Sequence, residues 1–395
     1  MKRNTKTILM ATLLFFSVAA MAQNTDNSSE FNAAESLLNS GSNLSIGGYA
    51  QIDFNQPVVD GERRNSTLDI HRLVLLFGYR FNEKTSFVSE IELEHVQEVY
   101  VEQAFMNHEF LPWLNLRGGL MLVPMGIQNE YHEPPTYNGV ERTNLDSKIV
   151  PTTWREIGLG FAGRFDQASM KYQLYVMNGF NGYDGAGKFR GSDGFRKGRQ
   201  KGAESFMSSP TVAARVDYYG IRGLKLGAST YLGKSQSSLY DGLDKDDDMA
   251  LAQADSSVIN IAMLGLDARY RNGGFEARGQ FNVANVSNTA EYNDFTGADL
   301  GSQMLGWYLE AGYDVFHGIQ NGQRLVPFVR YERYNTHAKT AGSLAENKSF
   351  DRTDVTIGAG WWLATGAVLK ADYQFFDTAA GSAGGQFNMG IGIWF

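Results

Sequence analysis

The chain has 395 residues with 44 glycines, 8 prolines and no cysteine, and 13% of its residues are aromatic. The absence of cysteine excludes a disulfide scaffold, thiolate catalysis and zinc sites that use sulfur ligands. A formal net charge of −8 at pH 7 provides no positive field for nucleic acid, so we expect no nucleic-acid partner. The glycine and aromatic content favours an all-β fold.

Residues 1–22 have the pattern of a cleaved signal peptide. Three basic residues precede a short apolar run over 8–18, and Ala20-Met21-Ala22 supplies the small-x-small site that signal peptidase requires. The alternative is an uncleaved membrane anchor, which the shortness of the apolar run disfavours. Cleavage would change the net charge from −8 to −11.

Residues 23–43 form a polar segment, which we interpret as a leader on the periplasmic side. Ala34, Leu37 and Leu38 fall at helical spacing behind Ser28 and Ser29, so a short helix is predicted here. We expect this leader to dock at the mouth of the domain that follows and to be too short to plug it.

From Leu44 onward, apolar and polar residues alternate in about sixteen segments of about ten residues each. In the first segment Leu44, Ile46 and Ile52 share one face, while Gln51 and Asp53 share the other. A period of two predicts strands with one apolar and one polar face.

The connections between these segments are alternately long and short. This alternation is typical of a transmembrane antiparallel up-and-down β-barrel with long extracellular loops and short periplasmic turns, here over residues 44–395 with about 16 strands. In hydrocarbon every backbone polar group must be paired, and a closed sheet leaves no edge. A water-soluble β protein is the alternative. The long connections are predicted at 55–66, 124–153, 181–210, 234–256, 286–303 and 335–352.

One stretch is ambiguous, because the alternation between residues 85 and 110 contains almost no turn residues. The reversal at 95–98 has neither glycine nor proline. Either two strands meet there at a very short outer loop, or the predicted register slips.

Several segments of the chain resemble a known family. Ile393-Trp394-Phe395 looks like the terminal signal of Gram-negative outer-membrane barrels. The runs 47–49, 119–126 (followed by Glu130 and then Glu141-Arg142), 172–179 and 327–332 are similar to the phosphate-selective porin O and P family.

This resemblance implies a homotrimeric diffusion channel in the outer membrane of a Gram-negative bacterium. Its surroundings would be membrane lipid and lipopolysaccharide, and its solutes would be ions and small hydrophilic molecules. The third external loop, at about 124–153, would fold inward as the constriction. A passive channel needs no cofactor, and we expect no bound metal.

Strand parity, which is the alternation of inward and outward residues along each strand, gives two sets of candidate pore residues. The predicted constriction loop gives a third set. The basic pore-lining candidates are Arg72, Arg117, Arg164, Arg215, Arg278, Arg330 and Lys370. The acidic pore-lining candidates are Glu90, Glu92, Glu94, Glu156 and Glu310. The constriction-loop candidates are Glu130, Glu133, Glu141, Arg142, Asp146 and Lys148.

The inward charges nearly balance, whereas phosphate capture needs an excess of cations. Leu122 also stands where the family's pre-loop segment has a lysine. Passive diffusion of ions and small hydrophilic solutes is therefore the predicted function, with anions such as phosphate left open.

Opposed rows of charge would order water across such a pore. One hypothesis is that four arginines on the inner wall face carboxylates of the third loop. The alternative is that these residues only hold the loop. The arginines are Arg72, Arg117, Arg164 and Arg215, and the carboxylates are those of Glu130, Glu133, Glu141 and Asp146.

Three other clusters favour simpler interpretations. The basic run 188–201 is predicted to be a solvated loop, although it could enter the mouth or contact lipopolysaccharide. The aspartates at 244 and 246–248 lack the glycine of the helix-loop-helix calcium pattern. His132 between Glu130 and Glu133 is a weak metal signal.

An enzyme and a non-conducting structural or adhesin barrel are the alternatives from other classes. None of the six histidines lies near a Gly-x-Ser-x-Gly motif. We therefore expect no enzymatic activity, and we expect His71 and His95 to be hydrogen-bonded structural residues.

Overall fold

The computed structural model describes residues 32–38, 42–59, 61–244, 246–319 and 322–395. The predicted signal peptide at 1–22 lies outside the described residues, as does most of the leader at 23–43. No helix among the residues described is both long enough and apolar enough to cross a bilayer.

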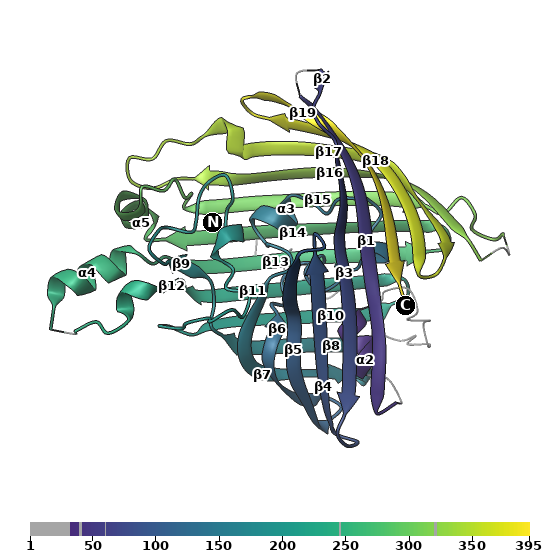
Figure 1. The fold of residues 1–395 in the computed structure, drawn as a ribbon, viewed down its shortest axis with the longest axis horizontal. Helices are drawn as coiled ribbons and strands as arrows, with labels where there is room; N and C mark the ends of the chain where they lie inside the picture. Colours follow the sequence, from purple (N-terminus) through teal and green to yellow (C-terminus); the bar gives the residue numbers. More distant parts are fainter. Residues whose placement is uncertain (1–31, 39–41, 60, 245, 320–321) are drawn as a thin grey trace, which may run out of the picture.

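In the described part of the chain, sixteen antiparallel strands form one closed ring (Figure 1). Each ring strand pairs with the next along the chain, and β1 pairs with β19 to close the ring. The predicted all-β barrel is therefore confirmed. The ring strands are β1 (Leu44–Val59), β3 (Thr67–Arg80), β4 (Thr85–Glu94), β5 (Glu98–Leu111), β6 (Leu114–Leu122), β7 (Arg155–Phe165), β8 (Met170–Met177), β10 (Thr211–Ile221), β11 (Leu224–Lys234), β13 (Asn260–Asn272), β14 (Phe275–Ser287), β15 (Gln303–Tyr313), β16 (Arg324–Lys339), β17 (Asp351–Ala364), β18 (Ala367–Thr378) and β19 (Gly381–Trp394).

Smaller elements occupy the connections and the segment before β1. Among the described residues, the α-helices are α2 (Ala33–Leu38), α3 (Leu145–Lys148), α4 (Asp248–Ser256) and α5 (Thr289–Thr296). The short strands are β2 (Glu62–Arg63), β9 (Asn181–Tyr183) and β12 (Gln236–Ser237). The 3₁₀ turns are η1 (Pro134–Thr136), η2 (Asp166–Ala168), η3 (Arg196–Gly198), η4 (Ser238–Tyr240) and η5 (Lys348–Phe350).

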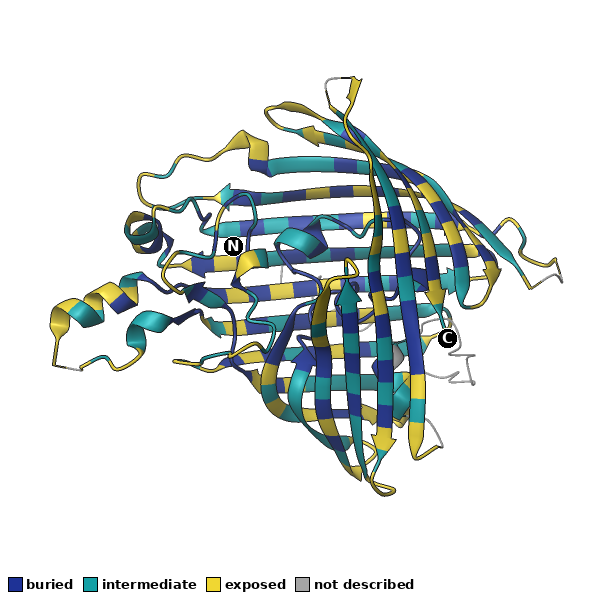
Figure 2. Ribbon diagram, viewed as in Figure 1, coloured by how far each residue is buried: buried dark blue, intermediate teal, exposed yellow. Residues whose placement is uncertain are grey.

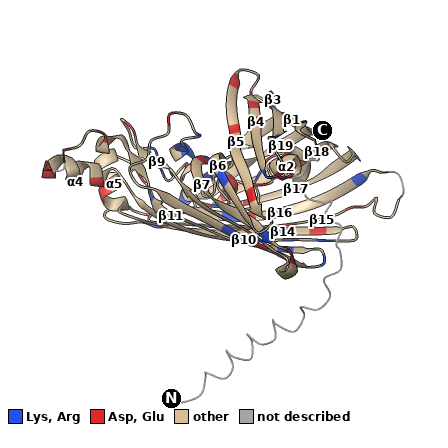
Figure 3. Cartoon of the chain, turned by 90° about the horizontal axis from the view of Figure 1, so that it is seen from below, with Lys and Arg blue, Asp and Glu red and all other residues tan. Residues whose placement is uncertain are grey.

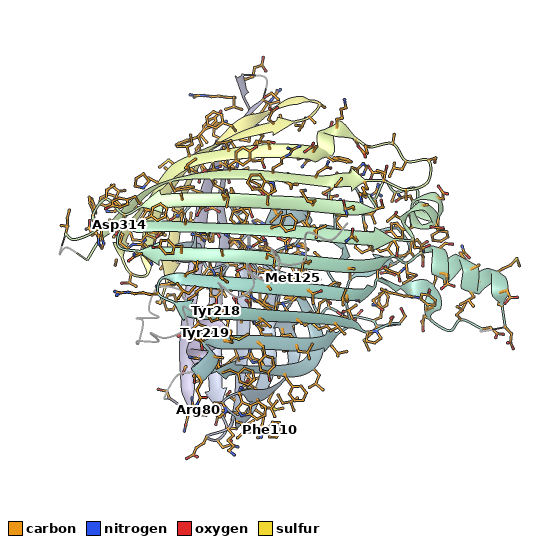
Figure 4. The ribbon with its side chains drawn as sticks, turned by 180° about the vertical axis from the view of Figure 1, so that it is seen from behind. Arg80, Phe110, Met125, Tyr218, Tyr219 and Asp314 are labelled. Atoms are coloured by element: carbon orange, nitrogen blue, oxygen red, sulfur yellow. The ribbon has the colours of Figure 1, made fainter. Side chains whose placement is uncertain are left out.

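The two ends of the barrel differ in the length of their connections. The connections that carry α4 and α5 lie at one end, on the left of Figure 1, which we call the long-loop end. The opposite end has mostly tight turns and is called the tight-turn end; Arg80, Phe110, Tyr218 and Asp314 mark it in Figure 4. Aromatic pairs gather there, including Trp113 with Phe165 at 6.1 Å between ring centroids. Such pairs are typical of the interfacial girdles of membrane barrels.

The two faces of the sheet differ in exposure, and buried residues alternate with more exposed ones along many strands (Figure 2). Outward side chains such as Leu159, Leu309 and Ile357 are exposed, whereas the inward side chains of Arg215 and Arg330 are buried. This arrangement is inverted relative to a water-soluble protein, and it suits a barrel whose outer surface meets lipid.

The ambiguous stretch contains a short loop, so β4 and β5 meet at residues 95–97. The backbone N–H of Gln97 donates to the carbonyl oxygen of Glu94 at 3.2 Å. His95 and Val96 form the two central positions of this turn, with φ angles of 52° and 65°. Two positive φ angles are the signature of a type I′ hairpin turn, which normally uses glycine or asparagine.

Two register shifts change which residues face inward. Between β1 and β3, Gln51 pairs with Arg72 but Asp53 pairs with Asp69, so β3 carries an extra residue. Between β4 and β5, a shift at Glu90 leaves Glu102 as the extra residue in β5. Bulges of this kind flip the parity of the strand that contains them.

Two segments lie inside the ring. The connection from β6 to β7, residues 123–154, is almost entirely buried and carries α3. Met125 of this third loop lies midway along the barrel in Figure 4. Helix α2 packs against β1, β3 and β4, and its Ala34 is buried in the same apolar cluster as Val88 and Phe105. Helix α2 therefore lies inside the ring near the tight-turn end. Docking of the whole leader 23–43 at the mouth stays a prediction.

Candidate functional site

The third loop is bound to the inner wall by side chains of β18. The ammonium of Lys370 donates to the carbonyl oxygens of Pro134 and Gly139 at 2.6 and 2.8 Å. The carboxylate of Asp372 accepts from the backbone N–H of Val140 at 2.6 Å. Buried backbone groups of an irregular loop need such partners, because an unpaired one is costly.

A second tether holds α3. The carboxylate of Glu332 accepts from the backbone N–H groups of Asn144, at 3.1 Å, and of Leu145. The side chain of Asn144 donates to Asp354 at 2.7 Å. A wall carboxylate at the first turn of a helix satisfies N–H groups that have no partner within the helix.

Arg215 lies at the centre of a buried cluster of carboxylates on the opposite wall. Its guanidinium lies 2.7 Å from Asp217, 2.8 Å from Asp267 and 3.1 Å from Glu130 of the third loop. The predicted loop residue Glu130 also accepts from Gln173. Through these ion pairs, Arg215 connects β10 and β13 to the third loop.

Two further predicted arginines lie close to the loop around Glu310. Arg278 Nε lies 2.9 Å from the Glu310 carboxylate, and Arg278 donates to the carbonyl oxygen of Thr136 at 3.1 Å. Arg330 lies 3.5 Å from Glu310 and donates to the carbonyl oxygen of Glu141 at 3.3 Å.

The remaining three arginines of the charge hypothesis have partners away from the carboxylates of the third loop. Arg72 lies 3.7 Å from Glu92, and Arg117 donates to Asn107 at 3.0 Å. Arg164 lies 3.3 Å from Asp166 at the tight-turn end, where its side chain is half exposed. Of the four arginines, Arg215 is thus the one that makes a described ion pair with a carboxylate of the loop.

The other predicted residues lie along the loop and wall. Glu133 is buried. On the loop, Glu141 accepts from Asn55 at 2.9 Å, Arg142 donates to the carbonyl oxygen of His132 at 3.1 Å, and Asp146 accepts from Gln280 at 2.8 Å. Lys148 lies 3.5 Å from Asp193. On the wall, Glu156 accepts from Trp154 at 2.9 Å, and Glu94 lies 4.0 Å from His95.

A buried network that parity did not predict surrounds His132. Its Nε2 lies 3.2 Å from Glu102 and 3.5 Å from Glu90, and Arg155 lies 3.4 Å from Glu102. Although burial alone would lower the pKa of His132, the contacts with Glu102 and Glu90 raise it to about 10. The bulge in β5 turns Glu102 inward. The exposed outward residues of β5 are Val99 and Val101 before the bulge and Met106 after it, so their spacing changes from even to odd. This change of spacing is the sequence signal that could have revealed the bulge.

A polar cavity of about 610 Å³ lies between the loops and the wall at the long-loop end. Basic side chains of the third loop, of the start of β7 and of the connection between β8 and β10 line it, and glutamates of β4 and β5 also line it. Figure 3 shows that both acidic and basic residues occur along the strands and loops of the barrel. The basic lining residues include Arg142, Arg155, Arg196, Arg199 and Lys201, and the acidic ones include Glu92, Glu94, Glu98 and Glu141.

The basic run 188–201 is packed against the third loop, which corrects the solvated-loop prediction. Phe189 and Phe195 are buried, and the N–H of Phe195 donates to the carbonyl oxygen of Lys148 at 2.9 Å. Arg196 and Arg199 donate to the carbonyl oxygen of Thr152 at 3.2 and 2.5 Å.

The positive charges of Arg196, Arg199 and Lys201 repel one another. Burial, followed by repulsion from Arg196 and Arg155, lowers the pKa of Arg199 to about 9. Burial and the charge of Arg199 also lower the pKa of Lys201. A small anion entering the cavity would relieve this repulsion.

Helix α2 connects the third loop to the tight-turn end. The side chain of Asn32 donates to the carbonyl oxygen of Glu130 at 2.6 Å, and Glu35 lies 3.4 Å from Lys171. A small cavity of about 30 Å³ remains between this helix, the loop and the wall.

Among the described residues, two groups have side chains placed so that they could hold a metal ion: Asp69 with His71 and His95, and Glu90 with Glu102 and His132. The described aspartates at 244 and 246–248 do not belong to either group.

The chain matches none of the family models, so the resemblance to the phosphate-selective porins is not confirmed at that level. Among solved structures it is similar to the outer membrane channel DcaP of Acinetobacter baumannii, with 10% identity, 89% and 97% of the two chains covered and a TM-score of 0.57. It is also similar to an anion-selective porin from Comamonas acidovorans, with 12% identity, coverages of 89% and 98%, and a TM-score of 0.53. The OmpT outer membrane protein of Vibrio cholerae, in its trimer form, gives 11% identity, coverages of 90% and 100%, and a TM-score of 0.50.

These structural similarities show a porin-like barrel fold. In sequence, the chain is 32% identical over 348 residues to a protein of Aquifex aeolicus (strain VF5) described as uncharacterized, covering 84% of this chain and 75% of that protein. The chain therefore belongs to the same protein family as the Aquifex aeolicus protein.

Proposed function

We propose that this protein is an outer-membrane porin, a passive channel for ions and small hydrophilic solutes. The observation that carries this proposal is a buried loop tethered to the inner wall of a closed barrel by Lys370, Asp372 and Glu332, beside a polar cavity. A water-filled barrel needs such a constriction to select solutes by size. The signal peptide predicted at 1–22 and the apolar outer face support export to the outer membrane.

The proposal extends to a preference for small anions at the long-loop end. Arg196 and Arg199 are paired with a carbonyl oxygen, which does not neutralise their charge. Phosphate remains one candidate among such anions. The glutamates that line the same cavity favour weak selectivity over tight capture.

The assembly state and surroundings belong to the same proposal. We expect a homotrimer, because a structurally similar protein is described in a trimer form. Membrane lipid and lipopolysaccharide would contact the apolar outer face and the external loops.

Swelling of proteoliposomes in sugars of increasing size tests passive diffusion. Folded protein should admit small sugars and exclude larger ones, whereas liposomes that stay impermeable would favour a non-conducting barrel. Hydrolysis of ester or peptide substrates by the same preparation would favour the enzyme alternative. The proposal predicts permeation without hydrolysis.

Reversal potentials in a salt gradient test the preference for anions. Replacing Arg142 and Lys201 by glutamine should shift the selectivity toward cations, because both side chains line the cavity. Arg333→Gln is the matched control, since Arg333 pairs with Asp351 and its side chain is 54% exposed. Equal reversal potentials for all three variants and the wild type would remove the anion preference from the proposal.

A further inference from the structure

We propose that Asp69, His71 and His95 bind one divalent transition-metal ion of the Zn²⁺ class at the long-loop end of the barrel. Each residue offers one ligand atom, and these atoms all lie within 4.8 Å of one another. Two imidazoles and one carboxylate form a ligand set that suits zinc, nickel or copper and leaves a position open for water.

The bulge in β3 creates the cluster. The outward residues of this strand are Leu68 and Ile70 before the bulge and Leu73 after it. His71 therefore faces inward directly before the inward Arg72. The carbonyl oxygen of His71 accepts from the backbone N–H of His95 at 3.3 Å, which places the two histidines on neighbouring strands side by side.

A strained turn places the second histidine. His95 and Val96 have φ angles of 52° and 65°, and a β-branched residue rarely adopts this conformation. Val96 is 65% exposed, so packing of its side chain does not explain the strain. The consequence of the turn is that the ring of His95 meets the ring of His71 edge-on, with 5.4 Å between centroids. Strain that persists at such a position is typical of a binding site.

The distances suit an ion placed between the three side chains. His95 Nδ1 lies 2.5 Å from Asp69 Oδ2, and His71 Nδ1 lies 3.7 Å from the same oxygen. A tetrahedral zinc with ligands at about 2.0–2.2 Å separates neighbouring ligand atoms by about 3.4 Å. The three ligand atoms would therefore have to move by less than about 1 Å to bind the ion. Glu94 lies 4.0 Å from Nε2 of His95, where it would orient the ring from outside the ligand set.

The cluster is open to solutes, and carboxylates of β4 lie beside it. His71 and His95 line the polar cavity of about 610 Å³, so an ion can reach them. Arg72, which follows His71 in the sequence, has Glu92 at 3.7 Å. Glu94 adds a further negative charge on the same strand as Glu92.

The second group of possible ligands does not suit an ion as well. Glu90 already accepts from Tyr49 and Gln103 at 2.8 and 2.7 Å, and Glu102 has Arg155 at 3.4 Å. These carboxylates and His132 are fully buried. An ion there would have to displace partners that already satisfy the charges.

Isothermal titration of the purified protein with zinc chloride tests the proposal. We expect one Zn²⁺ per chain, and at least about tenfold weaker binding for His95→Asn and for Asp69→Asn. His317→Asn is the matched control, because His317 is exposed at the tight-turn end and belongs to neither group. Absence of zinc binding by the wild type, or affinities of the cluster variants equal to that of the control, would overturn the proposal.

X-ray absorption at the zinc edge keeps the proposal testable where a variant does not fold. The wild-type protein loaded with one equivalent of zinc should show two imidazole ligands. A spectrum with one imidazole or none would overturn the proposal, since a single histidine would indicate the buried group at His132 or an unrelated surface site. Neither measurement depends on whether the barrel conducts.

Discussion

The guanidinium of Arg215 in β10 lies 3.1 Å from the carboxylate of Glu130 in the third loop. Asp217 and Asp267 lie at 2.7 and 2.8 Å from the same guanidinium. One buried cation thus serves three carboxylates, two on the wall and one on the loop. The position of the loop depends on this charge, because removing it would leave like charges facing one another.

Arg215→Met should therefore destabilise the protein by about 3–5 kcal/mol, the usual cost of leaving buried charges without a partner. Arg333→Met is the matched control, because Arg333 lies on the exposed side of β16 and should contribute about 0–1 kcal/mol. Urea unfolding of the protein in detergent micelles measures both values. Equal unfolding midpoints for the two variants would show that the Arg215 cluster does not hold the loop.

The pH dependence of stability should reveal His132. Its pKa in the folded protein is about 10, against about 6.5 when unfolded. A basic group with a raised pKa contributes stability that is complete below about pH 6.5 and is lost as the pH rises through about 10. The wild type should lose this contribution between these limits, and His132→Gln should not. Thermal midpoints of both proteins from pH 6 to pH 10.5 make the comparison, and parallel curves would contradict the assignment.

The wall contacts of Lys370 predict a change in conduction. Lys370→Met leaves the carbonyl oxygens of Pro134 and Gly139 without this donor, at a cost of about 1–3 kcal/mol for each buried group. The third loop should then fluctuate, and the single-channel current should become noisier with larger open levels. Lys84→Met, in an exposed tight turn, is the control. Identical current traces for the two variants would show that this tether is dispensable.

Helix α2 should restrict the tight-turn end of the pore. Deleting residues 32–38 removes the contacts of Asn32 with Glu130 and of Glu35 with Lys171, and should raise the conductance. The matched control is deletion of residues 248–256, which form the exposed helix α4 at the long-loop end. A conductance that rises equally in both deletions, or in neither, would show that α2 does not narrow the pore.

The barrel could be predicted from the sequence because its two solvents impose a strict alternation of residues. Lipid selects apolar side chains on one face of each strand, and water selects polar ones on the other. Parity therefore placed Arg215, Glu310 and Arg330 on the inner wall, where they lie. Parity fails at bulges, since one extra residue flips the face of everything beyond it. Glu102 was missed for this reason.

The contacts of the third loop could not be predicted in the same way. The charge hypothesis paired wall arginines with loop carboxylates, but the wall also supplies carboxylates, on Asp372 and Glu332, which accept from the loop backbone. Backbone N–H groups are present at every residue except proline, so no sequence pattern marks which of them will meet a side chain. The strained turn at His95 and Val96 was equally hidden, because neither residue is typical of that turn.

The most direct test of the channel is single-channel recording of the purified protein in planar lipid bilayers. Its β-barrel fold should first be verified by circular dichroism and by heat-dependent migration on gels. The protein should then insert to give stable, stepwise conductance in salt solution. Folded protein that inserts into the bilayer without carrying current would contradict the proposed function.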